Sequence, residues 1–152
     1  MKSNLESNNQ LDELLYDLSN RGMSNEGLDQ VESIIRSCWD KGVDVILDPT
    51  MEGSFGTYNP TTNDLTLGGN ALDCNVQLIE TLEHEFIHVL QDEIAGIHNS
   101  DMEALGLPTS EYGHQMVNEG YGHLDDHTQS LEVEAFTGEE MMDAGGFESI
   151  FV

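Results

Sequence analysis

The chain has 152 residues, and 30 acidic residues against 4 Lys or Arg give it a formal net charge of -26. This length suits one domain with a single hydrophobic core. A surface so negative repels nucleic acid and anionic membranes, because phosphate binding requires clusters of Lys and Arg. We therefore expect no nucleic-acid partner and no membrane partner. The acidity favours cationic partners, but it is also typical of adaptation to a salty environment or of plain solubility.

Two amphipathic helices are predicted in the first third of the chain. Residues 1–9 are polar, and we expect them to be disordered. Leucines at helical spacing then predict a helix over 11–18. A second helix is predicted over 24–42, with Ser at its start and Gly at its end. The apolar faces of both helices are interpreted as core-packing faces without a catalytic role.

A small sheet is predicted next, because the apolar period changes from helical spacing to two. VDVILD at residues 43–48 predicts a first strand. SFGTY at 54–58 and DLTLG at 64–68 predict two further strands, joined as a hairpin through the turn NPTTN.

The second half of the sequence predicts two helices separated by a long loop. The first helix runs from about 75 to 95 and the second from about 128 to 143. A loop as long as 96–127 usually carries function or short extra structure. The order of elements predicts an α+β fold, in which a small antiparallel or mixed sheet packs against the long helix. We expect a single domain over residues 1–152.

The sequence also favours a reducing compartment. Its first ten residues lack the apolar stretch of a secretory signal, and no segment approaches the length of a membrane span, so we expect a cytoplasmic protein. Cys38 and Cys74 lack metal-ligand spacing. Cys38 falls on an apolar helical face and is interpreted as a small buried hydrophobic residue.

The long helix contains HEFIH at residues 84–88. Residues four apart in a helix have Cβ atoms roughly 5–6 Å apart, so His84 and His88 can bind one metal ion. Glu85 is rotated by about 100° from His84, which places its carboxylate beside the ion. There it can act as a general base and then as a general acid. The alternative is a solvated helix face with two chance histidines, but the apolar opposite face favours a helix between core and cleft.

A catalytic zinc site usually has three protein ligands and an open fourth position. The extended pattern H-E-x-x-H-x-x-G-x-x-H takes its third ligand just downstream, but Gln91 and Ile94 stand where it requires Gly and His. The segment SLEVEAFTGEE, residues 130–140, offers glutamates from a later helix instead.

HEFIH followed by E-x-E-A on a second helix resembles the gluzincins, the glutamate-type zinc metallopeptidases. It looks most like small bacterial and phage members, whose ligand helix reads E-x-x-A followed by Asp or Asn. Aligned on Ala135, the resemblance implies that Glu132 is the third zinc ligand, with Glu134 in reserve. It also implies a zincin-like fold and hydrolysis of peptide bonds.

The chain departs from this family at Phe136, where many relatives have Asp or Asn. In the family that polar residue often holds a ligand histidine by its second ring nitrogen, and such a partner is generally needed to fix the tautomer. Here the partner must come from elsewhere, and a backbone carbonyl, Asp92 or Asp125 are candidates.

The long loop offers further candidates for the site. One of its His or Tyr side chains could donate a hydrogen bond to the developing oxyanion, and His123 is the first choice and Tyr121 the second. Asp125 or His127 could replace Glu132 as a metal ligand. The other histidines of the loop are His98 and His114, and histidines in a polar loop are mostly solvated.

The predicted strand at 54–58 could also contact a substrate. In this superfamily the edge strand commonly pairs with an extended substrate, and Gly56 would permit close approach. The simpler interpretation is an ordinary hairpin strand.

The predicted function is therefore a zinc metallopeptidase that acts on a peptide or protein substrate, and the acidic surface favours basic substrates. One alternative is a non-catalytic acidic interaction protein that imitates nucleic acid. In such a mimic the acidic residues should form rows at the spacing of phosphate groups. In this sequence the acidic residues are scattered through every segment. Another alternative is a degenerate relative that keeps the metal and binds peptides without cleaving them. The sequence does not indicate an oligomeric state.

Overall fold

The computed structural model describes residues 2–95 and 102–151. Its elements follow in the order β1 (Ser3–Leu5), α1 (Asn8–Asn20), α2 (Asn25–Asp40), β2 (Asp44–Asp48), β3 (Gly56–Asn59), β4 (Asp64–Gly68), α3 (Gly69–Leu72), α4 (Asn75–Ala95), α5 (Glu111–Gly120), α6 (Asp126–Gly145) and the 3₁₀ helix η1 (Phe147–Phe151). The predicted α+β class is confirmed. None of the helices in the described residues combines the length and the apolar character that a membrane span requires.

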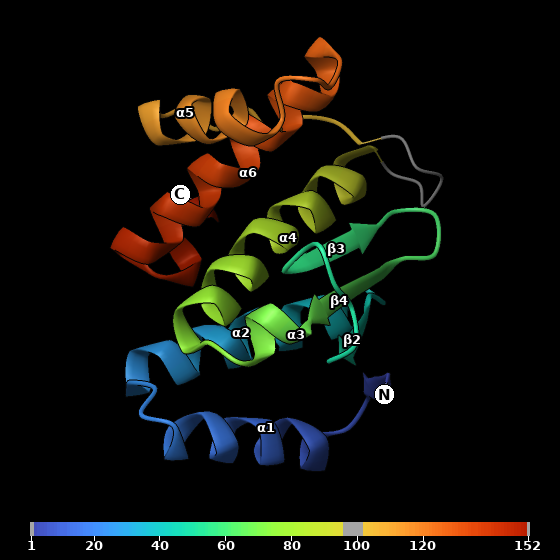
Figure 1. Cartoon of the computed structure of the whole chain (residues 1–152), viewed down its shortest axis with the longest axis vertical. Helices are drawn as coiled ribbons and strands as arrows, with labels where there is room; N and C mark the ends of the chain where they lie inside the picture. Colours follow the sequence, from blue (N-terminus) through green and yellow to red (C-terminus); the bar gives the residue numbers. More distant parts are fainter. Residues whose placement is uncertain (1, 96–101, 152) are drawn as a thin grey trace.

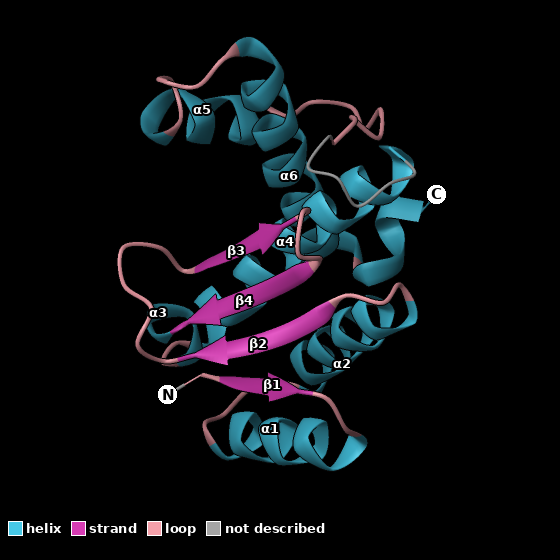
Figure 2. Ribbon diagram, turned by 90° about the vertical axis from the view of Figure 1, so that its right-hand side faces the viewer, coloured by secondary structure: helices cyan, strands magenta, loops and turns pink. Residues whose placement is uncertain are grey.

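The four strands form one mixed sheet in the order β1-β2-β4-β3. β2 and β4 run parallel, with Val45 opposite Leu65, and the other two pairs are antiparallel. β4 has the predicted bounds, whereas β3 begins at Gly56 rather than at residue 54. β3 forms one edge of the sheet and packs beside α4 (Figure 2).

The long helix α4 lies between the sheet and α6 (Figure 1). Leu82 and Phe86 of α4 are fully buried in the main core, together with Leu65 of β4 and Ile35 of α2. Because α6 covers the opposite side, every residue from 81 to 92 is buried, the two histidines included. This is a helix buried all round over its middle turns, rather than one with a polar stripe open to solvent.

The ends of α4 differ from the prediction. Val76 and Ile94 fall on the apolar face that the sequence predicts opposite the histidines, but they are 61% and 56% exposed in the structure. Both lie within the first or last turns of the helix, beyond the middle turns that the neighbouring elements cover. The apolar period therefore shows which face of the helix is packed. It does not show how far along the helix the neighbouring elements cover that face.

The expectation of a disordered N-terminus is wrong for residues 3–9. Ser3–Leu5 pairs with β2, and the side chain of Leu5 is only 4% exposed. Ser7 and Gln10 then form a reciprocal capping box that starts α1. The strand is too short to show an alternating pattern, and its stability comes from pairing with β2, a contact that local sequence does not reveal.

The predicted loop 96–127 contains a helix, α5, which packs against α6. Gly113 permits this packing, because a Cβ atom on it would lie 2.7 Å from the carbonyl oxygen of Val133 and 2.8 Å from the hydroxyl oxygen of Thr137. The C-terminal tail docks through η1, where Ile150 is 8% exposed.

We expect Gly113→Ala to destabilise the protein by about 1–3 kcal/mol, because α5 would have to move away from α6. Gly120→Ala is a matched control on the same helix, since a Cβ atom there would meet nothing within 4 Å. Helix propensity favours Ala over Gly in both variants, so the control should be neutral or slightly stabilising. Urea denaturation of both variants measures the difference, and equal stability would show that α5 does not pack this closely.

Candidate metal site

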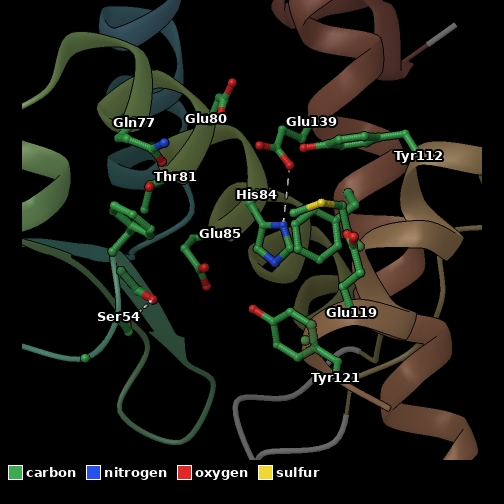
Figure 3. Close-up of a pocket in the computed structure, with 16 residues that line it drawn as sticks. Ser54, Gln77, Glu80, Thr81, His84, Glu85, Tyr112, Glu119, Tyr121 and Glu139 are labelled. Atoms are coloured by element: carbon green, nitrogen blue, oxygen red, sulfur yellow. Dashed lines mark hydrogen bonds and ion pairs between the residues drawn. The ribbon is translucent and has the colours of Figure 1, made fainter.

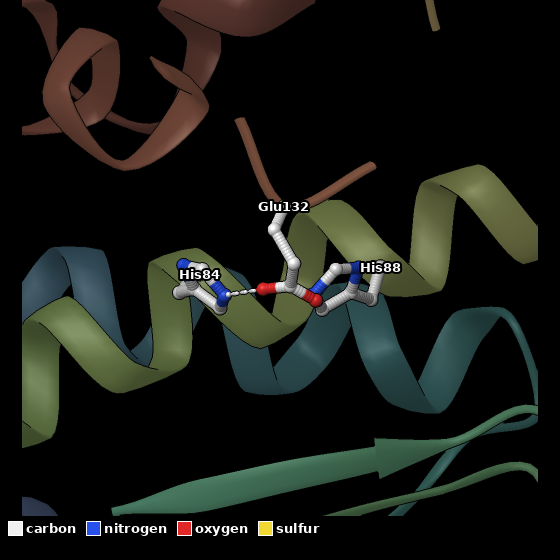
Figure 4. A group of neighbouring side chains, drawn as sticks. All are labelled: His84, His88 and Glu132. Carbon is white, nitrogen blue, oxygen red and sulfur yellow. Dashed lines mark hydrogen bonds and ion pairs between the residues drawn. The ribbon is translucent and has the colours of Figure 1, made fainter. Parts of the chain in front are cut away.

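His84 and His88 of α4 and Glu132 of α6 converge, as the sequence predicts (Figure 4). Nε2 of His84 lies 2.9 Å from Oε1 of Glu132, and Nε2 of His88 lies 3.0 Å from Oε2. One possible ligand atom from each of the three residues lies within 4.8 Å of those of the other two. Among the described His, Cys, Asp and Glu residues, no other group of three or more comes this close together. These three side chains are therefore positioned to hold a metal ion.

The electrostatics of this cluster match a cation site. Burial alone would lower the pKa of His84, but the hydrogen bond with Glu132 and the nearby carboxylates of Glu139 and Glu85 raise it to about 10. The pKa of His88 is also raised, because Glu132 and Glu85 outweigh its burial. The two histidines in turn hold the pKa of Glu132 well below its usual value, although burial opposes them. A metal ion would replace the protons that the two Nε2 atoms share with this carboxylate.

The second ring nitrogen of His88 has a partner that the sequence prediction missed. Its Nδ1 atom lies 2.7 Å from Oε1 of Gln91, one turn later on α4. The two acids proposed for this role act elsewhere, since Asp92 accepts a hydrogen bond from the hydroxyl of Tyr58 and Asp125 caps the N-terminus of α6. The spacing of three between His88 and Gln91 was the signal that could have identified this contact.

The second ring nitrogen of His84 faces Glu139. Nδ1 of His84 lies 3.8 Å from Oε2 of Glu139, which is longer than a hydrogen bond. Phe136, one turn before Glu139 on α6, packs on the imidazole of His84 with ring centroids 4.3 Å apart. The acid that faces His84 is therefore Glu139, two helical turns after Glu132. The resemblance to gluzincins places the polar residue one turn after Glu132, at the position that Phe136 occupies here.

Glu134, the reserve ligand, points away from the metal cluster. Its carboxylate accepts hydrogen bonds from the backbone N–H groups of residues 105, 106 and 107 at 2.7, 2.8 and 2.9 Å. It also accepts one from Nε2 of Gln91 at 2.9 Å. Glu132 and Glu134 thus lie on different sides of α6, as expected from their spacing of two, and of these two only Glu132 faces the histidines.

A cleft of about 480 Å³ opens beside the cluster, and His84 and Glu85 line it. Figure 3 shows the side chain of Glu85 and the hydroxyl of Tyr121 directed into this cleft, close to the ring of His84. Burial raises the pKa of Glu85 above its usual value, although His84 and His88 oppose the shift. Burial and neighbouring carboxylates also raise the pKa of Tyr121, so its hydroxyl keeps its proton and can donate a hydrogen bond.

The described histidines of the predicted loop do not belong to the cluster. His123, the first choice for an oxyanion donor, is exposed and is not among the residues that line the cleft. His114 is exposed, and Nε2 of His127 lies 3.1 Å from the carbonyl oxygen of Met102. His98 lies outside the described residues. Of the two predicted donors, the structure brings only Tyr121 to the cleft.

β3 borders the cleft, and Gly56 is one of its lining residues. A Cβ atom on Gly56 would lie 2.5 Å from Cγ2 of Thr81 and 2.8 Å from the carbonyl oxygen of Thr66. The glycine is therefore required for packing of the strand on α4, independently of any substrate. Cys38 is buried as predicted, and Cys74 is exposed.

Comparisons with models of protein families, with curated proteins and with solved structures found no match to this chain. The resemblance to gluzincins therefore rests on the motif residues and on the geometry of His84, His88 and Glu132.

Proposed function

We propose that this chain is a zinc-dependent metallopeptidase of the gluzincin type, with a zincin-like fold. The observation that carries the proposal is the convergence of His84, His88 and Glu132 beside a cleft that also contains Glu85. Two imidazoles and one carboxylate are a donor set that suits zinc and leaves a fourth position open. The two histidines are buried, Glu132 is half-buried, and the three side chains are held from two helices, which is typical of a preorganised site.

Zinc held by these residues would supply Lewis-acid chemistry, polarising a substrate carbonyl and lowering the pKa of a bound water to about 7. Glu85 accepts the proton of the attacking water and delivers it to the nitrogen of the leaving amine. The raised pKa of Glu85 suits both steps, because a carboxyl group exchanges protons best when its pKa approaches the working pH.

Tyr121 takes the role of hydrogen-bond donor to the developing oxyanion in this proposal, in place of His123. Its hydroxyl reaches into the cleft and stays protonated, whereas His123 lies outside the cleft lining. A donor held in this position stabilises negative charge that appears only as the carbonyl is attacked.

The cleft favours basic substrates. Among the described residues that line it, four are glutamates (Glu80, Glu85, Glu119 and Glu139) and none is Lys or Arg. Burial raises the pKa of Tyr112 to about 12, and carboxylates around it, Glu139 first among them, add to the shift, as expected where negative charge is not balanced. A cleft with this potential concentrates cationic peptides and increases their rate of association.

We expect peptides with Lys or Arg near the scissile bond to be cleaved with a kcat/KM at least about 10-fold higher than matched peptides with Asp or Glu. The difference should shrink in high salt, because the charges are screened. Mass spectrometry of matched peptide sets measures both effects, with the zinc-loaded protein and with a chelator-treated control. Equal cleavage of acidic and basic peptides at low salt would remove the substrate preference, and cleavage that survives chelation would contradict the zinc mechanism.

A further inference from the structure

We propose that Gln91 and Glu134 are positioning residues of the metal site, which set the tautomer of His88 so that its Nε2 atom is the ligand. The inference rests on metal binding at this site and not on peptidase activity. Neither residue enters the cleft or contacts the three ligand atoms. Their effect passes through hydrogen bonds within the buried space between α4 and α6.

The side-chain amide of Gln91 can have only one orientation. Its Nε2 atom donates to the carbonyl oxygen of Leu131 at 3.1 Å and to Oε1 of Glu134 at 2.9 Å. If the amide were turned over, its oxygen would face these two acceptors with no proton between them, which is costly for a fully buried side chain. The oxygen of Gln91 must therefore face His88.

The orientation of Gln91 then decides the state of His88. The amide oxygen is an acceptor only, so Nδ1 of His88, at 2.7 Å, must carry a proton and donate it. In the neutral imidazole that would bind a metal, the proton on Nδ1 leaves the lone pair on Nε2, the atom that faces Glu132. Outer partners of this kind orient a ligand histidine and raise its basicity.

Glu134 is the anchor of this arrangement. It is 3% exposed, and its two oxygens accept three backbone N–H groups from residues 105–107 in addition to the amide of Gln91. Such a set of donors satisfies a buried carboxylate. The segment 105–107 is thereby tied to the metal site, although it is distant from His88 along the chain.

We expect Gln91→Leu to weaken zinc binding by about 10–100-fold and Glu134→Gln to weaken it by about 10-fold. Glu140→Gln is the matched control, because Glu140 is exposed on the same helix. Competition with a chromophoric chelator measures the affinity for zinc. The titrations are made well below the melting temperature of each metal-free variant, so that all variants are folded. Glu134→Gln keeps the size of the side chain and serves as the second variant if Gln91→Leu does not fold.

Side-chain ¹⁵N spectra separate positioning from a merely structural role. The zinc-loaded wild type should show a protonated Nδ1 and a zinc-bound Nε2 in His88. The metal-free protein should show a slowly exchanging Nδ1 proton that Gln91→Leu loses. Coordination through Nδ1, or variants that lower the melting temperature while zinc affinity and the His88 signals stay unchanged, would overturn the proposal. Neither measurement involves hydrolysis, so an absence of peptidase activity would leave both results interpretable.

Discussion

Glu85→Gln should abolish peptide hydrolysis while the protein still binds zinc. The variant keeps the size of the side chain but loses the group that accepts a proton from water, and a general base typically contributes about 10²–10⁴-fold to the rate. We therefore expect kcat/KM to fall by at least about 100-fold. Glu85 is not among the three converging ligand residues, so the variant should retain about one zinc ion per chain. Steady-state kinetics on a basic peptide and elemental analysis measure the two quantities together.

Glu93→Gln is the matched control for this variant. Glu93 is exposed on the same helix, and its ion pair with Lys41, at 2.8 Å, lies at the surface, where such pairs contribute little. Its activity should equal that of the wild type. If Glu85→Gln keeps more than a tenth of the wild-type rate, Glu85 is not the base. If the wild type binds zinc and basic peptides but cleaves none of them, the chain is a peptide-binding relative without activity.

Glu132→Ala and His84→Ala should each eliminate zinc binding. Removal of either leaves two protein ligands where a zinc site needs at least three. In the wild type, zinc at 100 times its dissociation constant should stabilise the fold by about 2.7 kcal/mol, which corresponds to roughly 5–10 °C in melting temperature. The variants should lose this increase, and thermal unfolding with and without zinc measures it. The effect of zinc on each variant is measured against the melting temperature of the same variant without metal. This reference is needed because both substitutions also remove the ion pair between His84 and Glu132.

Glu140→Ala is the control for the ligand variants, since it makes the same substitution at an exposed position of α6. It should keep the full stabilisation by zinc. Zinc binding that persists in Glu132→Ala would place the third ligand elsewhere. A wild type that takes up no zinc would favour the remaining interpretation, an acidic protein whose histidines do not bind metal.

The sequence by itself predicted the pair His84 and His88 and the helices that carry the cluster, while the choice of Glu132 came from the resemblance. A helical spacing of four places His84 and His88 on one face whatever surrounds them, and the spacing of two between Glu132 and Glu134 separates those residues on α6. The order of apolar periods was likewise sufficient for the α+β class and for the bounds of β4 and α4. These features follow from local backbone geometry, so they are visible in the residues.

Only the tertiary structure decided how the site is supported. Glu139 faces His84, and Glu134 orients Gln91 toward His88, only because of how α6 crosses α4, and no periodicity encodes that crossing. The choice of Tyr121 over His123 depends on where the turn after α5 is placed relative to the cleft. The strand β1 exists because β2 offers it an edge. Contacts between segments distant in the chain are set by packing, for which a single sequence carries no local signal.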